Sequence, residues 1–153
     1  MRWVEYFRNL AHNVKLKSKD TSTQIGAIIV GKDKEIVSTG YNSFPRGLND
    51  NLKSRQERPE KYYWFEHGER NAIYNAARIG VSTKGCTMYL SCGIPCVDCT
   101  RGIINSGITR IFCERGVTTK GGKHWEENYN RSWEMLEEAG INVQFYDDDY
   151  GGL

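Results

Sequence analysis

The amino-acid sequence predicts an α/β fold: a three-layer α/β/α sandwich around a five-stranded mixed sheet, in a single domain over residues 1–153. The chain of 153 residues has the usual length of one domain and is long enough to bury a core. Two apolar runs separated by a short turn predict an antiparallel hairpin. Beyond the hairpin, apolar runs alternate with helical patterns, which predicts parallel strands with helices on the sheet faces.

The first elements follow from apolar spacing. A helix is predicted at the N-terminus because apolar side chains recur at helical spacing, at Trp3, Phe7, Leu10 and Val14. Residues 25–30 form a continuous apolar run typical of a buried strand, and residues 31–34 turn the chain into a second strand over 35–41. Residues 42–65 form a long polar connection rich in Arg and Lys. Such a connection is either a solvated surface loop or a flap over a small anionic ligand.

The remaining elements alternate between helix and strand. Their predicted order is helix 66–79, strand 87–91, helix 96–106, strand 110–113, a helix with Tyr129, Trp133, Leu136 and Ala139 on one face, and strand 142–145. Gly80 and Gly107 end the first two of these helices. A glycine-rich loop that contains Gly121 and Gly122 leads into the third.

Composition excludes several functional classes. Lys and Arg number 21 against 19 Asp and Glu, so the net charge of +2 lacks the basic excess of a dedicated nucleic-acid binder. No apolar stretch reaches the length of a membrane span, and the N-terminus has no apolar leader, so we expect a cytosolic protein. Five cysteines without a secretion signal make a poor disulfide framework. We expect Cys86, Cys92 and Cys113 to be small buried hydrophobic residues.

Two short segments carry the chemistry, and each opens a predicted helix. The first is His67-Gly68-Glu69, and the second is the run Pro95-Cys96-Val97-Asp98-Cys99. A Cys-x-x-Cys pair alone indicates either a redox dithiol or half of a zinc site. With His67, the two thiols make three zinc ligands with a fourth position open, which is the pattern of a catalytic zinc.

Glu69 adds a proton carrier to this set. Two thiolates cancel the charge of Zn²⁺, so the metal acidifies its water less than an all-imidazole site would, and a nearby carboxylate can take the proton. The alternative is that Glu69 only complements the helix dipole. His-x-Glu followed by Pro-Cys-x-x-Cys is, however, the signature of the zinc nucleobase deaminases.

Within that class the chain resembles the deoxycytidylate (dCMP) deaminases, from about residue 3 to residue 146. The segments that carry the resemblance are 22–27, 40–47, 67–73, 84–89 and 103–108. The long insertion before His67 is also similar, whereas the tRNA-editing relatives have a shorter connection. The resemblance implies a cytidine deaminase-like fold. Those enzymes usually have Ala where this chain has Gly68, a change that should not remove a ligand.

The resemblance also implies a reaction, in which dCMP is hydrolysed to dUMP and ammonia to supply the thymidylate pathway. Glu69 would deprotonate the zinc-bound water, whose hydroxide attacks C4 of cytosine, and would then protonate N3 and the leaving amine. Asn42 is similar to the family residue that contacts the sugar, and Ser22, Thr23 and Arg46 are expected to contact the phosphate. The family further implies a hexamer and regulation by dCTP or dTTP.

Several rival interpretations keep the same residues. The substrate would then be cytidine, guanine, a pterin or riboflavin precursor, or adenosine in tRNA. A zinc-stabilised binding module without turnover is another alternative, but such a module needs no carboxylate beside an open metal position. A redox Cys-x-x-Cys protein would hold no metal.

Overall fold

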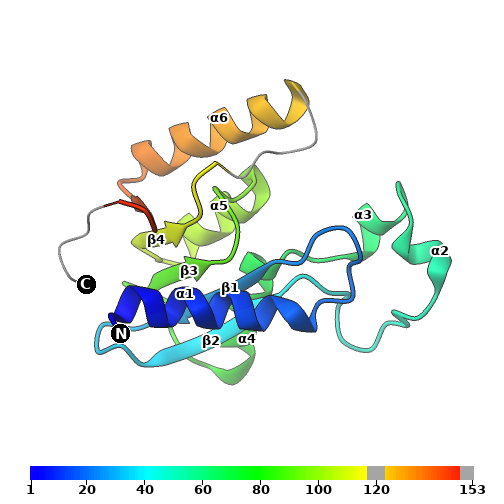
Figure 1. Cartoon of the computed structure of the whole chain (residues 1–153), viewed down its shortest axis with the longest axis horizontal. Helices are drawn as coiled ribbons and strands as arrows, with labels where there is room; N and C mark the ends of the chain where they lie inside the picture. Colours follow the sequence, from blue (N-terminus) through cyan, green and yellow to red (C-terminus); the bar gives the residue numbers. More distant parts are fainter. Residues whose placement is uncertain (117–122, 149–153) are drawn as a thin grey trace.

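The computed structural model describes residues 1–116 and 123–148, and one five-stranded sheet runs through it (Figure 1). The strand order is β2-β1-β3-β4-β5, with bounds Ile36–Tyr41, Gly26–Val30, Thr87–Leu90, Arg110–Cys113 and Asn142–Phe145. The first three strands of that order are antiparallel, and β3, β4 and β5 are parallel. The predicted mixed sheet is therefore confirmed, including the hairpin of β1 and β2.

Helices cover both faces of this sheet. Helix α1 (Trp3–Val14) packs on one face, where its Phe7 meets Ile28, Tyr89 and Phe112 in one apolar cluster. The second cluster contains buried side chains from the three longer helices of the other face. These are α4 (Gly68–Ile79), α5 (Val97–Asn105) and α6 (Lys123–Glu138). The three-layer arrangement is confirmed, and β1 is buried along its whole length because both layers cover it.

Two glycines bring the helices close to the hairpin. A Cβ atom at Gly26 would lie 2.2 Å from the carbonyl oxygen of Ala11 in α1, and one at Gly40 would lie 2.2 Å from the backbone nitrogen of Ala72 in α4. Both distances are far below van der Waals contact, so these positions require glycine. The close approach at Gly40 fixes α4, and with it the residues that open this helix, against β2.

The long connection after β2 has more structure than the sequence predicts. It contains two single-turn helices, α2 (Lys53–Gln56) and α3 (Lys61–Trp64), which lie together at one end of the molecule (Figure 1). Buried Phe44 contacts the rings of Trp64 and Phe65, so the far end of the connection packs against its beginning. A bridge between Ser43 and Glu66 then closes the excursion immediately before His67.

Two further expectations concern the rest of the chain. Within residues 1–116 and 123–148, none of the helices has the length and apolar character needed to cross a bilayer. The predicted loop with Gly121 and Gly122 lies outside the described residues.

Candidate active site

The starts of helices α4 and α5 meet, and this junction brings the predicted ligands together. His67 and Cys96 are the N-cap residues of α4 and α5, and Cys99 lies in the first turn of α5. His67 Nδ1 is 3.5 Å from Cys96 Sγ and 3.3 Å from Cys99 Sγ. All three candidate ligand atoms lie within 4.8 Å of one another, so they can hold one metal ion.

The donor set fits zinc in both geometry and chemistry. Zinc–ligand bonds of about 2.1 Å to nitrogen and 2.3 Å to sulfur place tetrahedral ligand atoms roughly 3.6 Å apart. The two N–S distances here, 3.5 and 3.3 Å, are close to that spacing without any rearrangement. Both cysteines are free thiols. One imidazole and two thiols from the chain leave room for a fourth ligand, as in catalytic zinc sites.

Hydrogen bonds among the three side chains shift their pKa values, and the shift at Cys96 favours metal binding. Hydrogen bonds from Cys99 and His67 outweigh burial and lower the pKa of Cys96 to about 4. The hydrogen bond with Cys96, supported by the nearby Glu69 carboxylate, raises the pKa of His67. The hydrogen bond with Cys96, together with burial, raises the pKa of Cys99. These shifts favour the thiolate form at Cys96, the form of cysteine that ligates metal.

Glu69 lies beside the ligands in the first turn of α4 and is 2% exposed. Among the described residues, its Oε1 atom has no hydrogen-bond partner. Burial raises the pKa of this carboxyl, against the attraction of His67. A buried carboxyl with an unpaired oxygen is costly to fold, so its presence here indicates a role toward a bound water or substrate. Such a group can accept a proton and release it again within one reaction.

A salt-bridge chain, which the sequence analysis missed, links the two helix starts. Glu66 Oε1 accepts hydrogen bonds from the backbone nitrogen of His67 at 2.9 Å and from Arg70 Nε at 2.8 Å. Arg70 reaches toward α5, where its guanidinium is 3.8 Å from Asp98. The Glu66–Arg70 spacing of four residues is a recognisable helical ion-pair signal, but the contact to Asp98 depends on the fold.

Three of the four predicted substrate contacts lie together, beside the start of α4. The Asn42 side chain accepts a hydrogen bond from the Ile25 backbone nitrogen and donates one to the Thr23 carbonyl oxygen, each at 2.8 Å. A Cβ atom at Gly68 would lie 3.0 Å from the Ile25 oxygen and 3.3 Å from the Asn42 nitrogen. Ile25 and Asn42 therefore border the turn that carries His67 and Glu69, and Thr23 is held to Asn42. The glycine at position 68 permits this close approach.

Asp20 and Lys61 anchor this border, and sequence reasoning did not identify them. Lys61 Nζ, from α3, is 3.0 Å from Asp20 Oδ1 and 2.8 Å from Ser22 Oγ. The Asp20 and Lys61 side chains are only 8% and 10% exposed. Burial disfavours the charged form of Asp20, but hydrogen bonds from Ser22, Lys61 and Thr23 outweigh it and lower the pKa of Asp20. The long connection is thereby tied to the predicted phosphate segment.

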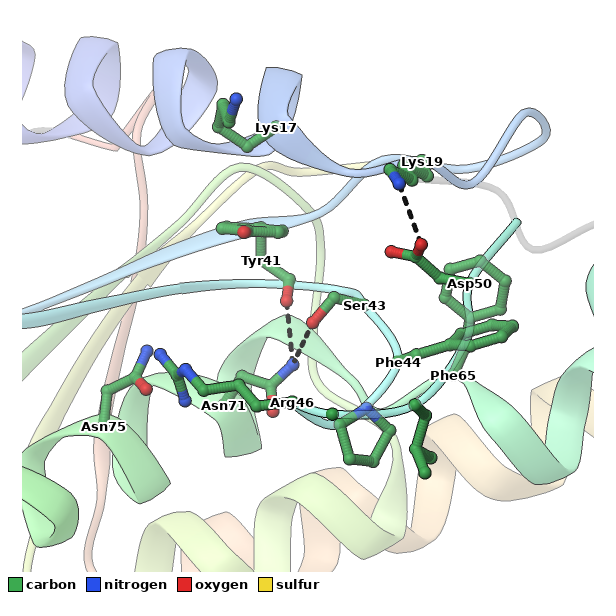
Figure 2. A pocket seen from close by; sticks show the side chains of 13 residues that line it. Lys17, Lys19, Tyr41, Ser43, Phe44, Arg46, Asp50, Phe65, Asn71 and Asn75 are labelled. Carbon is green, nitrogen blue, oxygen red and sulfur yellow. Dashed lines mark hydrogen bonds and ion pairs between the residues drawn. The ribbon is translucent and has the colours of Figure 1, made fainter.

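Arg46, the fourth predicted contact, lines a pocket of about 350 Å³. Figure 2 shows Arg46 beside Asn71 and Asn75 of α4, whereas Lys17 and Lys19 come from the N-terminal segment. Asn71 donates hydrogen bonds to the Tyr41 carbonyl oxygen at 2.8 Å and to Ser43 Oγ at 3.2 Å. The pocket is thus lined by the N-terminal segment, by the end of β2 with the connection that follows it, and by α4.

This fold, with a His-Cys-Cys cluster and a buried glutamate at two helix starts, is that of the zinc-dependent nucleobase deaminases. A family profile described as "Cytidine and deoxycytidylate deaminase zinc-binding region" matches residues 1–115. The chain belongs to this family of hydrolytic enzymes, whose bound metal is zinc.

Comparisons with individual proteins agree with the family. The chain is 36% identical to the "Uncharacterized deaminase in luxG 3'region" of Aliivibrio fischeri over 142 residues, which cover 93% of this chain and 92% of that protein. It is 38% identical to deoxycytidylate deaminase of Mus musculus over 117 residues, which cover 73% of this chain but 64% of the mouse enzyme. Its fold matches that of dCMP deaminase from the cyanophage S-TIM5, crystallised with dCMP and dUMP, with a TM-score of 0.71, 21% identity, and coverage of 92% of this chain and 94% of that one.

Proposed function

We propose that this chain hydrolyses dCMP to dUMP and ammonia, and so supplies thymidylate synthesis. The observation that carries the reaction type is the cluster of His67, Cys96 and Cys99 beside the buried Glu69, whose Oε1 atom has no hydrogen-bond partner among the described residues. The choice of dCMP draws on the relatives named deoxycytidylate deaminase, of which the mouse enzyme is 38% identical to this chain.

In this proposal His67, Cys96 and Cys99 hold zinc, which when bound lowers the pKa of a water molecule so that it can act as a nucleophile near neutral pH. Glu69 Oε1 takes a proton from the attacking water and delivers it to N3 of the cytosine ring. The water oxygen becomes bonded to C4. The same carboxyl then carries the second proton to the exocyclic amine, the C4–N bond breaks, and ammonia leaves.

The remaining residues hold the nucleotide. We propose that Asn42 positions the sugar, since it borders the turn of His67 and Glu69. Ser22, Thr23 and Arg46 are the proposed phosphate contacts. Ser22 and Thr23 are exposed at the end of the segment that Asp20 and Lys61 fix, so a phosphate can reach them there.

We expect dCMP to have a kcat/KM at least about tenfold higher than deoxycytidine. Each charge-assisted hydrogen bond to the phosphate contributes about 1.5–3 kcal/mol, and about 1.4 kcal/mol is a factor of ten in rate. Steady-state ammonia release with both substrates measures the ratio. Equal values, or a faster reaction on cytosine or adenine within a nucleic-acid strand, would mean that the chemistry acts on another substrate.

Variants locate the phosphate contact. Ser22→Ala should lower kcat/KM for dCMP and leave that for deoxycytidine nearly unchanged, because only the nucleotide carries the anion. Ser54→Ala is the matched control, since Ser54 is an exposed serine in α2. If Ser22→Ala lowers kcat/KM equally for both substrates, Ser22 supports the loop and does not contact the phosphate.

We also propose that dCTP or dTTP regulates the enzyme. The pocket of about 350 Å³ supports this, because it combines Lys17, Lys19 and Arg46 with two side-chain amides of α4. One of these amides, Asn71, is two residues beyond Glu69. Addition of dCTP or dTTP should change the rate at subsaturating dCMP. Lys17→Gln should weaken that response while Lys32→Gln, another exposed lysine, keeps it. An unchanged rate with both triphosphates would contradict regulation.

The family resemblance leads us to propose a homohexamer. Large apolar side chains remain exposed in the chain, among them Trp3 at 49%, Tyr74 at 51% and Tyr63 at 82%, and they offer contact area for an interface. Light scattering at micromolar concentration should give about six times the 17.5 kDa chain mass. A particle with the mass of one chain would contradict the proposal.

A further inference from the structure

Helix α6 reaches the candidate metal centre through one side chain. The Oδ1 atom of Asn128, in the first half of α6, accepts a hydrogen bond of 3.1 Å from the backbone nitrogen of Val97. Val97 is the first residue of α5 and lies between the two cysteine ligands. The contact spans 31 residues, and Asn128 lies beyond residue 115, where the family match ends.

The first turn of a helix contains backbone N–H groups that lack partners within the helix, so their acceptors orient the turn. In α5 the Cys99 N–H group donates to Cys96 Sγ at 3.5 Å. This contact ties the two ligands to each other but not to the rest of the protein. The Val97 N–H group, in contrast, is held from outside α5 by Asn128.

Helix α6 is a firm support for such a contact. Leu136 is fully buried in the core, and α6 packs directly against α5 along the sheet face. Asn128 itself is partly buried and lies in the first half of α6. The Asn128 side chain therefore transmits the position of a packed helix to the turn that carries two of the three ligands.

We propose that Asn128 is a positioning residue of the metal centre, whose hydrogen bond to Val97 holds Cys96 and Cys99 in register with His67. This inference rests on the zinc site of the proposed function and adds to it a residue outside the zinc-binding region. Groups that orient metal ligands commonly change metal affinity by about 10–100-fold when they are removed. Removal of the Asn128 side chain should therefore weaken zinc retention more than it lowers folding stability.

Zinc release to an excess of a colorimetric chelator tests the proposal in the zinc-loaded protein. Asn128→Ala should release zinc at least about tenfold faster than the wild type, as expected for a lost ligand-orienting group. Asn128→Asp, which keeps an acceptor oxygen at the same place, should release it at close to the wild-type rate. Asn130→Ala is the matched control, because Asn130 is an exposed asparagine on the same helix.

The zinc-release rates of the three variants can contradict the proposed role of Asn128. The positioning role is overturned if Asn128→Ala releases zinc at the wild-type rate. It is also overturned if Asn128→Asp releases zinc as fast as Asn128→Ala, or if the control Asn130→Ala releases it faster than the wild type. A wild-type protein that binds no zinc would instead overturn the proposed function.

If Asn128→Ala does not fold, hydrogen exchange of the wild-type Val97 amide gives a second test. Protection of this amide supports the hydrogen bond, and exchange at the rate of a free helix terminus overturns it.

Discussion

Glu69→Gln is expected to keep the metal and lose activity by about 10²-fold or more, the range that a positioned general acid–base group contributes. Gln has nearly the same shape as Glu but cannot take up and release a proton at neutral pH. Glu69 is 2% exposed and its Oε1 atom is unpaired among the described residues, so the amide should fit the same space. Ammonia release under saturating dCMP measures the loss.

Two controls separate proton transfer from a structural effect. The zinc content of Glu69→Gln should match that of the wild type, because Glu69 is not among the three candidate ligands. Its unfolding temperature should be no lower than that of the wild type, because the substitution removes a buried carboxyl. Glu137→Gln removes an exposed carboxyl from α6 and should leave the rate unchanged. A Glu69→Gln enzyme that turns over near the wild-type rate would exclude Glu69 as the proton carrier.

Cys99→Ala should lose most of the zinc and the activity together. Cys99 is fully buried, and its sulfur is 3.3 Å from His67 Nδ1, so its removal leaves two of the three candidate ligands. Zinc then binds far more weakly, since affinity depends on the number of ligands that the fold presents. Metal analysis of the dialysed protein and the rate under the same conditions measure both losses.

A second buried cysteine provides the comparison. Cys86 is 5% exposed and packs in the core of the α4–α6 face, as the sequence predicts for a small hydrophobic residue. Cys86→Ala should therefore keep its zinc, with only a modest loss of stability from the smaller side chain. Full zinc occupancy in Cys99→Ala would show that Cys99 is not a ligand.

The parts of the site that are local in sequence could be predicted from it. His67 and Glu69 lie in one helix start and Cys96 and Cys99 in another, and the ligand chemistry of these residue types is specific. The apolar runs likewise predict the sheet, because a strand buried by two layers of helices needs continuous hydrophobic residues. The helix starts themselves differ by only one or two residues from the prediction.

The supporting contacts could not be predicted, because they join distant segments. Asp20 and Lys61 are 41 residues apart, and Val97 and Asn128 are 31 apart. Which polar side chains meet depends on the path of the long connection, which has no periodic signal. It also depends on the placement of α6, whose apolar face predicts a helix but not the partners of its polar side chains. Gly68 is similar, since its close approach to Ile25 and Asn42 becomes visible only when the hairpin and α4 are placed together.

The buried Asp20–Lys61 pair restricts how this protein can be redesigned. Removing one partner of a buried ion pair leaves an uncompensated charge and costs about 3–5 kcal/mol, a large share of the roughly 5–15 kcal/mol that stabilises a domain. A segment transplanted from a relative into positions 53–66 of the long connection must therefore bring a cation to position 61, or residue 20 must be replaced in the same step. A transplanted loop without that cation would lower the stability of the chimera, and its activity would then report stability together with specificity.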